Sequence, residues 1–217
     1  MTASSLELLE INSFSKECSE CLTDVSDDEI CVELIRERFP DLLKNKQIIA
    51  DILENIVDGK EYPDTRSSTM FDNELLLYAD PSRLFSLRLF LWGPGEYTVI
   101  HDHNSWGVIG SVSGELEVFN YRREDDSSKE GYALISETKK LTCQPGETYY
   151  TLRLNDGIHK IGNPTKDTMI SLAIYGNPIN RGYINGYDIA NNRVYRIFAP
   201  KSKKKRLAGE ALPGLRE

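Results

Sequence analysis

The hydrophobic period of this chain changes near residue 75, and this change constrains the fold more than any other feature. Upstream, apolar residues recur at three- and four-residue spacing over 35–57, which predicts helices. Downstream, short apolar runs alternate with polar residues and are separated by Gly, Asn and Asp, which predicts strands and turns. We therefore expect a helical segment over 1–60 and a β-barrel over 70–200.

Turn residues divide the second part of the chain into short strands at intervals of about ten residues, a spacing typical of antiparallel sandwiches and barrels. The expected strands cover 84–92, 108–112, 115–121, 131–141, 149–154 and 169–175. In the helical part, Pro40 is expected to end or restart a helix, and Asp58-Gly59 to stop one. These features favour a mainly β chain that forms one domain over 1–217, with an N-terminal helical cap.

The composition excludes several classes of protein. With 34 acidic and 26 basic residues and a net charge of −8, the chain is too acidic for nucleic acid to be its primary partner. The basic run Lys201–Arg206 is expected to be a solvated tail. The sequence has neither a transmembrane-length apolar stretch nor the features of a signal peptide. We expect a cytoplasmic monomer or homodimer that does not bind membranes.

The four cysteines do not indicate a disulfide framework in a chain of this size. Cys18-x-x-Cys21 could suggest zinc or redox chemistry, but no second Cys/His pair lies near it in the sequence. We therefore expect two buried or idle thiols.

Only three histidines occur in the chain, and their positions suit a metal site. His101 and His103 flank Asp102 in a segment expected to be extended. Because strand side chains alternate between faces, the two imidazoles should point one way and Asp102 the other. A third imidazole from His159 would complete three corners of a coordination site.

These histidines also lie within motifs that resemble those of the cupin superfamily. Gly95 with His101-x-His103 fits the first cupin motif, and Pro145-Gly146 with His159-x-x-x-Asn163 fits the second. The resemblance implies a double-stranded β-helix, a jelly-roll-like barrel. Where the first motif usually supplies a glutamate ligand, this chain has Gly107-Val108. The implied site therefore consists of three neutral imidazoles, and Asn163 is expected to support the loop that holds His159.

Longer stretches are similar to the thiol dioxygenases, the cysteine dioxygenase and 3-mercaptopropionate dioxygenase family. They are Tyr78–Pro81, Trp92–Gly95, His101–Gly110, His159–Asn163 and Ser171–Tyr175. The resemblance implies one Fe(II) ion per chain, with a small thiol and O2 as substrates. Both oxygen atoms would pass to sulfur and give a sulfinate. Three protein ligands on one face would leave the opposite face open for both substrates.

The resemblance also assigns catalytic positions. Tyr175 matches the tyrosine of the family's active site, and Ser171 matches the serine of its Ser-His-Tyr relay. The central histidine of that relay is Ala173 here, so Tyr175 is expected to act alone unless water or another side chain bridges the gap. Gly107 lies near the position of the cysteine that animal cysteine dioxygenases cross-link to this tyrosine, and no cross-link is expected.

The substrate-binding position departs from the family pattern. The family usually has an Arg or Gln a few residues before the Tyr78–Pro81 match, and Glu74 stands there instead. Either another arginine replaces it, with Arg88 and Arg181 as candidates, or the substrate carries an amine that pairs with Glu74. Glu74 could also pair with Arg88 as a structural ion pair. Trp92 matches a residue of the family's pocket wall.

Two other functions remain open from the sequence. A three-histidine zinc site could activate water for hydrolysis or isomerisation, with Glu74 as the only candidate base. Alternatively, the chain could be a cupin that binds a metal or ligand without catalysis, since the relay histidine and the usual clamp arginine are both missing.

Overall fold

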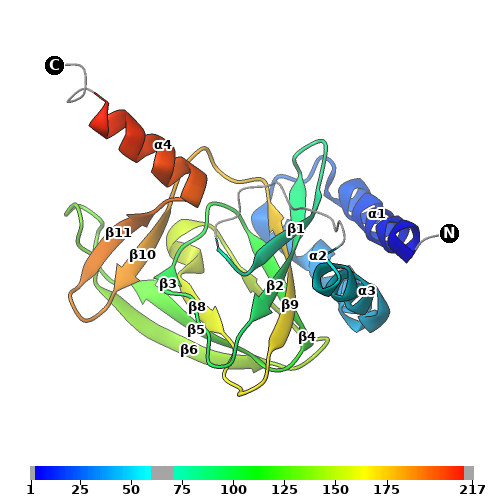
Figure 1. The fold of residues 1–217 in the computed structure, drawn as a ribbon. Helices are drawn as coiled ribbons and strands as arrows, with labels where there is room; N and C mark the ends of the chain where they lie inside the picture. The colour runs from blue at the N-terminus through cyan, green and yellow to red at the C-terminus, as the bar shows by residue number, and fades with distance from the viewer. Residues whose placement is uncertain (1–2, 60–70, 213–217) are drawn as a thin grey trace.

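The computed structural model describes residues 3–59 and 71–212 (Figure 1). Three helices come first: α1 (Ala3–Leu22), α2 (Asp28–Lys44) and α3 (Lys46–Val57). The Asp27 carboxylate caps α2 by accepting hydrogen bonds from the backbone N–H groups of Glu29 and Ile30, at 2.9 and 3.1 Å. After α3 the chain turns at Gly59, whose φ of +66° suits glycine, so the expected stop at Asp58-Gly59 is confirmed.

The expectation for Pro40 is wrong, because α2 continues through it. Phe39 and Leu43, on either side of the proline, are both buried. Leu43 packs directly on Gly110 of the barrel, where a Cβ atom would lie 2.3 Å from the Leu43 Cδ1. Packing of this apolar face offsets the hydrogen bond that proline cannot donate.

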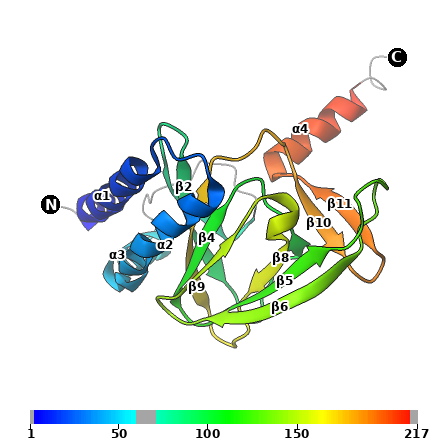
Figure 2. The same cartoon turned by 180° about the vertical axis from the view of Figure 1, so that it is seen from behind.

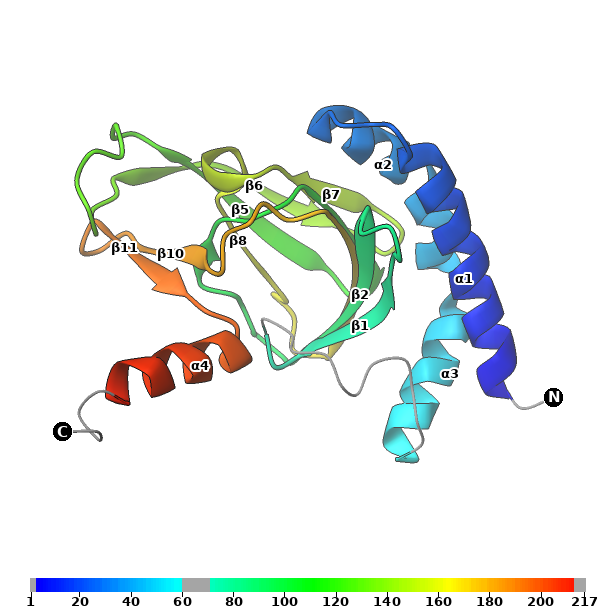
Figure 3. The same ribbon diagram turned by 90° about the horizontal axis from the view of Figure 1, so that it is seen from above.

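Two antiparallel sheets follow the helices. The five-stranded sheet has the order β1 (Glu74–Ala79), β2 (Phe85–Trp92), β9 (Met169–Gly176), β4 (Gly107–Ser113), β7 (Thr148–Thr151). The six-stranded sheet has the order β11 (Arg193–Ile197), β10 (Ile184–Asp188), β3 (Ile100–His101), β8 (His159–Gly162), β5 (Leu116–Arg123), β6 (Ile135–Cys143). Figure 3 shows how the two sheets enclose an interior.

From β2 to β9 the chain switches sheets at every connection except the β5–β6 hairpin. The resulting orders, β2-β9-β4-β7 in one sheet and β3-β8-β5-β6 in the other, are those of a double-stranded β-helix or jelly roll. The expected fold, a mainly β cupin barrel preceded by a helical cap, is therefore confirmed.

The alternation of side chains along β2 separates two apolar cores. Leu87 and Leu89 face outward and pack with the helices, which cover the outer face of the five-stranded sheet (Figures 1 and 2). Phe90 and Trp92 face the barrel interior with residues such as Ile109 and Met169. The same alternation places Arg88 on the interior face, as its strand parity predicted.

Several elements differ from the expectations. The expected strand 149–154 ends at Thr151 and leads into η1 (Leu154–Gly157), a 3-10 turn. Strands β10 and β11 were not predicted. The basic run lies in helix α4 (Pro200–Ala211), which has no buried residue and projects away from the barrel in Figure 1, so its side chains are solvated as expected. Within the described residues, no helix is both long and apolar enough to cross a membrane.

Candidate metal centre

The three histidines converge inside the barrel, as their spacing predicted. His101 on β3 lies directly opposite His159 on β8 in the antiparallel register, and His103 follows just beyond the end of β3. Each pair of imidazole ring centroids is 4.8 Å apart, and the three candidate ligand atoms all lie within 4.8 Å of one another. All three residues are buried, with 8% or less of their surface exposed.

Hydrogen bonds fix which nitrogen of two imidazoles carries the proton. The Nδ1 of His101 lies 2.9 Å from the Val99 carbonyl oxygen, which only accepts, so Nδ1 donates and Nε2 keeps its lone pair. The Nδ1 of His159 lies 3.1 Å from the Tyr149 hydroxyl. That hydroxyl donates its own proton to Asn120 Oδ1 at 2.6 Å and so accepts from His159. Both Nε2 atoms are therefore free to coordinate a metal.

The spacing and charge of the donor atoms fit a transition-metal ion. The Nε2 atoms of His103 and His159 are 3.0 Å apart, and two imidazoles on one ion at metal–nitrogen distances of about 2.1 Å have nitrogens roughly 3.0–3.4 Å apart. Burial lowers the pKa of all three imidazoles. The neighbouring His101 lowers the pKa of His103 further, and the neighbouring His103 and His101 lower that of His159. Neutral imidazoles suit zinc, copper, iron and nickel, so the three histidines could hold any of these ions.

A pocket of about 180 Å³ opens beside the histidines. Its apolar walls include Phe71, Phe90 and Ile184, and its polar lining includes His103, Glu74, Arg88 and Tyr175. It therefore connects the proposed metal position with the charged residues on which substrate recognition would depend.

Tyr175 stands between the histidines and the charged end of this pocket. Its ring stacks on the His103 ring, with 5.5 Å between centroids and an interplanar angle of 19°. None of the described residues hydrogen-bonds its hydroxyl, and burial with the nearby negative charge of Glu74 raises its pKa. The ring lies against Gly107, where a Cβ atom would be 2.7 Å from two ring carbons. The hydroxyl is thus protonated and free to donate.

Glu74 and Arg88 form an ion pair in the pocket between the Arg88 Nη1 and the Glu74 Oε1. Arg88 Nε also donates to the Ser86 Oγ at 3.0 Å, and the guanidinium carbon lies 5.9 Å from the centroid of the Tyr175 ring. The side chain of Glu74 is 2% exposed and that of Arg88 is 27% exposed. A ligand entering the pocket therefore meets the arginine more readily than the glutamate.

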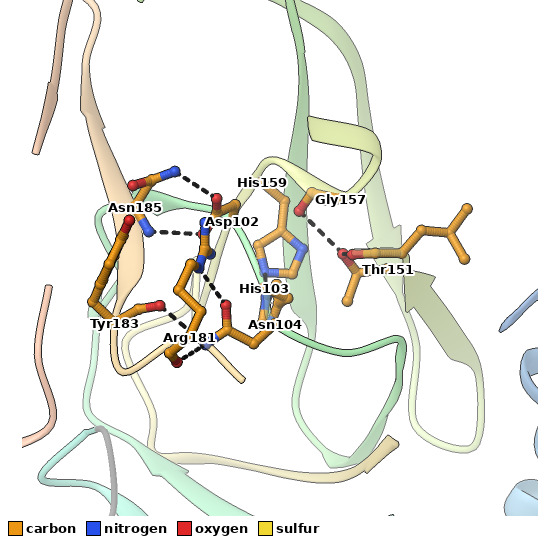
Figure 4. A network of polar contacts seen from close by, with 10 residues as sticks. Asp102, His103, Asn104, Thr151, Gly157, His159, Arg181, Tyr183 and Asn185 are labelled. Carbon is orange, nitrogen blue, oxygen red and sulfur yellow. Dashed lines mark hydrogen bonds and ion pairs between the residues drawn. The ribbon is translucent and has the colours of Figure 1, made fainter. Parts of the chain in front are cut away.

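Arg181 lies elsewhere. Its guanidinium is bound by Asp102 and Asn104 (Figure 4), and Arg181 is not part of the pocket lining. Asp102 is buried and turned away from the histidines, as the alternation of side chains predicted.

Ser171 and Trp92 are paired with each other inside the barrel, where the Trp92 indole N–H donates to Ser171 Oγ at 2.9 Å. Ala173 lies between Ser171 and Tyr175 on the same face of β9. Because its methyl group can neither donate nor accept a proton, the serine and the tyrosine are not linked through this strand.

Asn163 supports the loop that follows β8. Its amide donates to the carbonyl oxygens of Gly93 and Asp167 at 3.0 and 2.7 Å, and its Oδ1 accepts from Thr165. It thereby joins the end of the His159 strand to the end of β2, which is consistent with the supporting role expected of it.

No sequence pattern singles out Tyr149 or Asn120, the two residues that orient His159. Tyr149 lies on β7 in the five-stranded sheet, whereas His159 lies on β8 in the other sheet. Their contact crosses the barrel interior, and only the inward parity of Tyr149 on its strand could have indicated it.

No protein-family model matches the chain. It is similar to a cupin 2 domain-containing protein from Halorhodospira halophila (17% identity, 59% of this chain and 76% of the other, TM-score 0.40). A cupin 2 conserved barrel domain protein from Salinispora arenicola is also similar (16% identity, 54% and 87%, TM-score 0.37). A third is an uncharacterized conserved protein with a double-stranded beta-helix domain from Klebsiella pneumoniae (12% identity, 65% and 93%, TM-score 0.36). All three TM-scores are below 0.5, so the assignment of the fold rests on the strand order.

The structure thus defines a double-stranded β-helix with a buried triad of neutral histidines that could hold a metal ion.

Proposed function

We propose that this chain is a non-haem iron dioxygenase of a small thiol. The observation that carries the proposal is the position of the pocket, which brings a three-histidine site, a protonated tyrosine and an arginine to one cavity. The bound Fe(II) would supply the redox chemistry that transfers both atoms of O2 to a thiolate sulfur, giving a sulfinate.

Each group of the chain has a role in this proposal. The three imidazoles are neutral, so they leave the positive charge of the ion uncancelled, which favours binding of a thiolate over a neutral thiol. The Tyr175 ring stacks on the His103 ring, and its hydroxyl would donate a hydrogen bond to a substrate atom bound beside the histidines. Phe71, Phe90 and Ile184 would exclude water from the reacting atoms.

Arg88 is the residue we expect to recognise the substrate. Its Nε and Nη1 groups donate to Ser86 and Glu74, whereas Nη2 donates to none of the described residues. This remaining N–H group can bind a carboxylate, which favours a carboxylate-bearing thiol such as cysteine or 3-mercaptopropionate. An amine thiol such as cysteamine is the alternative. Its amine would have to displace the Arg88 guanidinium from the Glu74 carboxylate.

The test starts with protein loaded anaerobically with Fe(II), whose oxygen uptake is measured with cysteine, 3-mercaptopropionate and cysteamine. We expect stoichiometric oxygen uptake and a sulfinate product with the two acids. Arg88→Met should raise the KM for the acids tenfold or more, and Arg196→Met, an exposed arginine on β11, should leave it unchanged. Turnover of cysteamine alone would show that Glu74, and not Arg88, recognises the substrate.

The same experiment separates the proposal from its rivals. A zinc hydrolase needs a free general base. Among the described residues that line the pocket the only carboxylate is Glu74, and it is ion-paired with Arg88. Metal analysis of protein produced without added zinc tests this alternative directly. Absence of oxygen uptake with every thiol, at one Fe(II) per chain, would indicate a cupin that binds a metal or ligand without catalysing dioxygenation.

A further inference from the structure

The residue between the first two histidines belongs to a buried polar network of its own. Asp102 is 1% exposed, and its carboxylate accepts hydrogen bonds from Arg181 Nη2 at 2.6 Å, the Asn185 backbone N–H at 2.7 Å and Asn185 Nδ2 at 2.9 Å (Figure 4). The Asp102 backbone N–H in turn donates to the Asn185 carbonyl oxygen at 3.0 Å. Every one of these partners lies between β9 and the middle of β10, so this network joins the histidine segment to a different part of the chain.

Asn104, the residue after His103, makes a second set of hydrogen bonds between the histidine segment and the Arg181 region. Its Oδ1 accepts from Arg181 Nε at 2.6 Å, and its Nδ2 donates to the carbonyl oxygens of Arg181 and Tyr183 at 2.9 and 3.0 Å. Its backbone oxygen accepts from the Ile179 N–H at 2.8 Å. His103 is therefore flanked on both sides by residues that bind Arg181, as the close-up in Figure 4 shows.

The segment that Arg181 fixes is the loop 177–183, which joins β9 to β10. None of its residues is buried, so apolar packing contributes little to its position. Pro178 of this loop nevertheless lines the pocket, and Tyr175 lies just before the loop on β9. The polar network is consequently the main attachment between one wall of the pocket and the histidines.

We propose that Asp102 and Arg181 are positioning residues that hold the His101–His103 segment and the loop 177–183 in one fixed arrangement. Their charges also cancel, so the buried carboxylate adds no net charge beside the histidines. The pair thus preserves both the geometry of the metal site and its positive charge when an ion is bound. The inference depends on metal binding by the histidines, and it does not require that the metal catalyse thiol oxidation.

Removing one partner of this pair should have a larger effect than removing both. Arg181→Met leaves a buried carboxylate without its counter-ion, and Asp102→Asn leaves a largely buried guanidinium without one. Asp102→Asn/Arg181→Met removes both charges together. A purely structural surface contact would not produce this pattern in the properties of the metal site.

The test uses the full chain with Co²⁺ as the probe, because its visible absorption reports coordination geometry. The release rate of Co²⁺ to a chelator is measured for each variant that remains folded. We expect Arg181→Met to release Co²⁺ at least tenfold faster than the unmodified chain, with an altered absorption spectrum. The double variant should recover part of this difference. Arg122→Met is the control, since the Arg122 side chain is 70% exposed and pairs with Glu124, and it should release Co²⁺ at the native rate.

Release rates within twofold of the native value and an unchanged spectrum in folded Arg181→Met would overturn the proposal. If Arg181→Met does not fold, Arg181→Lys takes its place, because lysine keeps the charge opposite Asp102 but cannot also donate to Asn104 as Nε does. We expect faster release from this variant too, and a native rate would again overturn the proposal. Since neither measurement involves turnover, a chain that oxidises no thiol but shows these changes would refute the proposed function and support this inference.

Discussion

The Nε2 atoms of His103 and His159 lie 3.0 Å apart, although the two residues are separated by 56 positions in the chain. Because both imidazoles are buried and have pKa values well below the usual range, the pair is neutral near pH 7. Two neutral nitrogens at this distance can share one cation, and His101 supplies a third.

Replacing Tyr149 with phenylalanine should weaken metal binding without unfolding the barrel. The substitution removes the acceptor for the His159 Nδ1 proton, and loss of such an orienting partner typically costs about 10–100-fold in metal affinity. Competition titration with a chromophoric chelator measures the effect. Tyr150→Phe is the matched control, since Tyr150 is 44% exposed and makes no contact with the histidines. An unchanged affinity in Tyr149→Phe would show that the hydrogen bond does not orient His159.

The metal-free protein should lose stability as the pH falls below about 6.5, the ordinary pKa of histidine. Burial depresses the pKa of His101, His103 and His159 in the folded state, so the unfolded chain binds more protons in this range. The stabilisation is therefore complete above pH 6.5 and is lost below it, by up to about 1.4 kcal/mol per pH unit for each histidine. Urea unfolding at pH 7.5 and 5.5, with chelator present, measures the difference.

A variant with fewer titrating groups serves as the control for this pH dependence. His159→Gln should show a smaller loss of stability between pH 7.5 and 5.5 than the unmodified chain. Carboxylates with depressed pKa values, such as Asp125 at about 2, lose their contribution only at much lower pH and do not interfere. Equal unfolding midpoints for the unmodified chain at both pH values would contradict the prediction.

Gly107→Ala should displace Tyr175 while leaving the histidines in place. The added methyl group would lie 2.7 Å from the tyrosine ring, which is closer than van der Waals contact allows. Overpacking of this kind typically costs about 1–3 kcal/mol of stability. We expect a lower urea midpoint and weaker thiol binding with metal stoichiometry retained. Gly182→Ala, in a position where an added Cβ meets nothing within 4 Å, should change none of these properties.

Separating Glu74 from Arg88 should destabilise the barrel more than neutralising both. Arg88→Met removes the counter-ion of the nearly buried Glu74 carboxylate, and breaking a buried ion pair in this way costs about 3–5 kcal/mol. Because Arg88 is partly exposed, we expect a loss near the lower end of this range. Glu74→Gln/Arg88→Met should be the more stable of the two variants in urea unfolding, and the reverse order would show that the pair is not coupled.

The features that were predictable from the sequence depend on local patterns, namely the alternation of side chains and the hydrophobic period. Alternation around His101 and His103 fixes which side chains share a face, and the same rule placed Arg88 inside the barrel and Asp102 away from the histidines. The change of hydrophobic period near residue 75 is also a local pattern, and it separated the helices from the strands.

The features that were not predictable depend on which distant segments meet. The contact between Tyr149 and His159 joins two sheets across the interior, and the pairing of Arg181 with Asp102 depends on the path of a loop. Neither leaves a periodic signal along the chain. Pro40 was misjudged because the local rule against proline in helices does not include the burial of Phe39 or the packing of Leu43 on the barrel.

The direct pairing of His101 with His159 across two hydrogen-bonded strands has a consequence for how the protein acquires its ion. Backbone bonds of the completed sheet set the separation of these two ligands, so the site is preorganised before any metal arrives. Folding and metal loading can then occur at different times and in different surroundings. The ion that the chain carries would reflect the supply of metals around the mature protein as well as the preference of its donors.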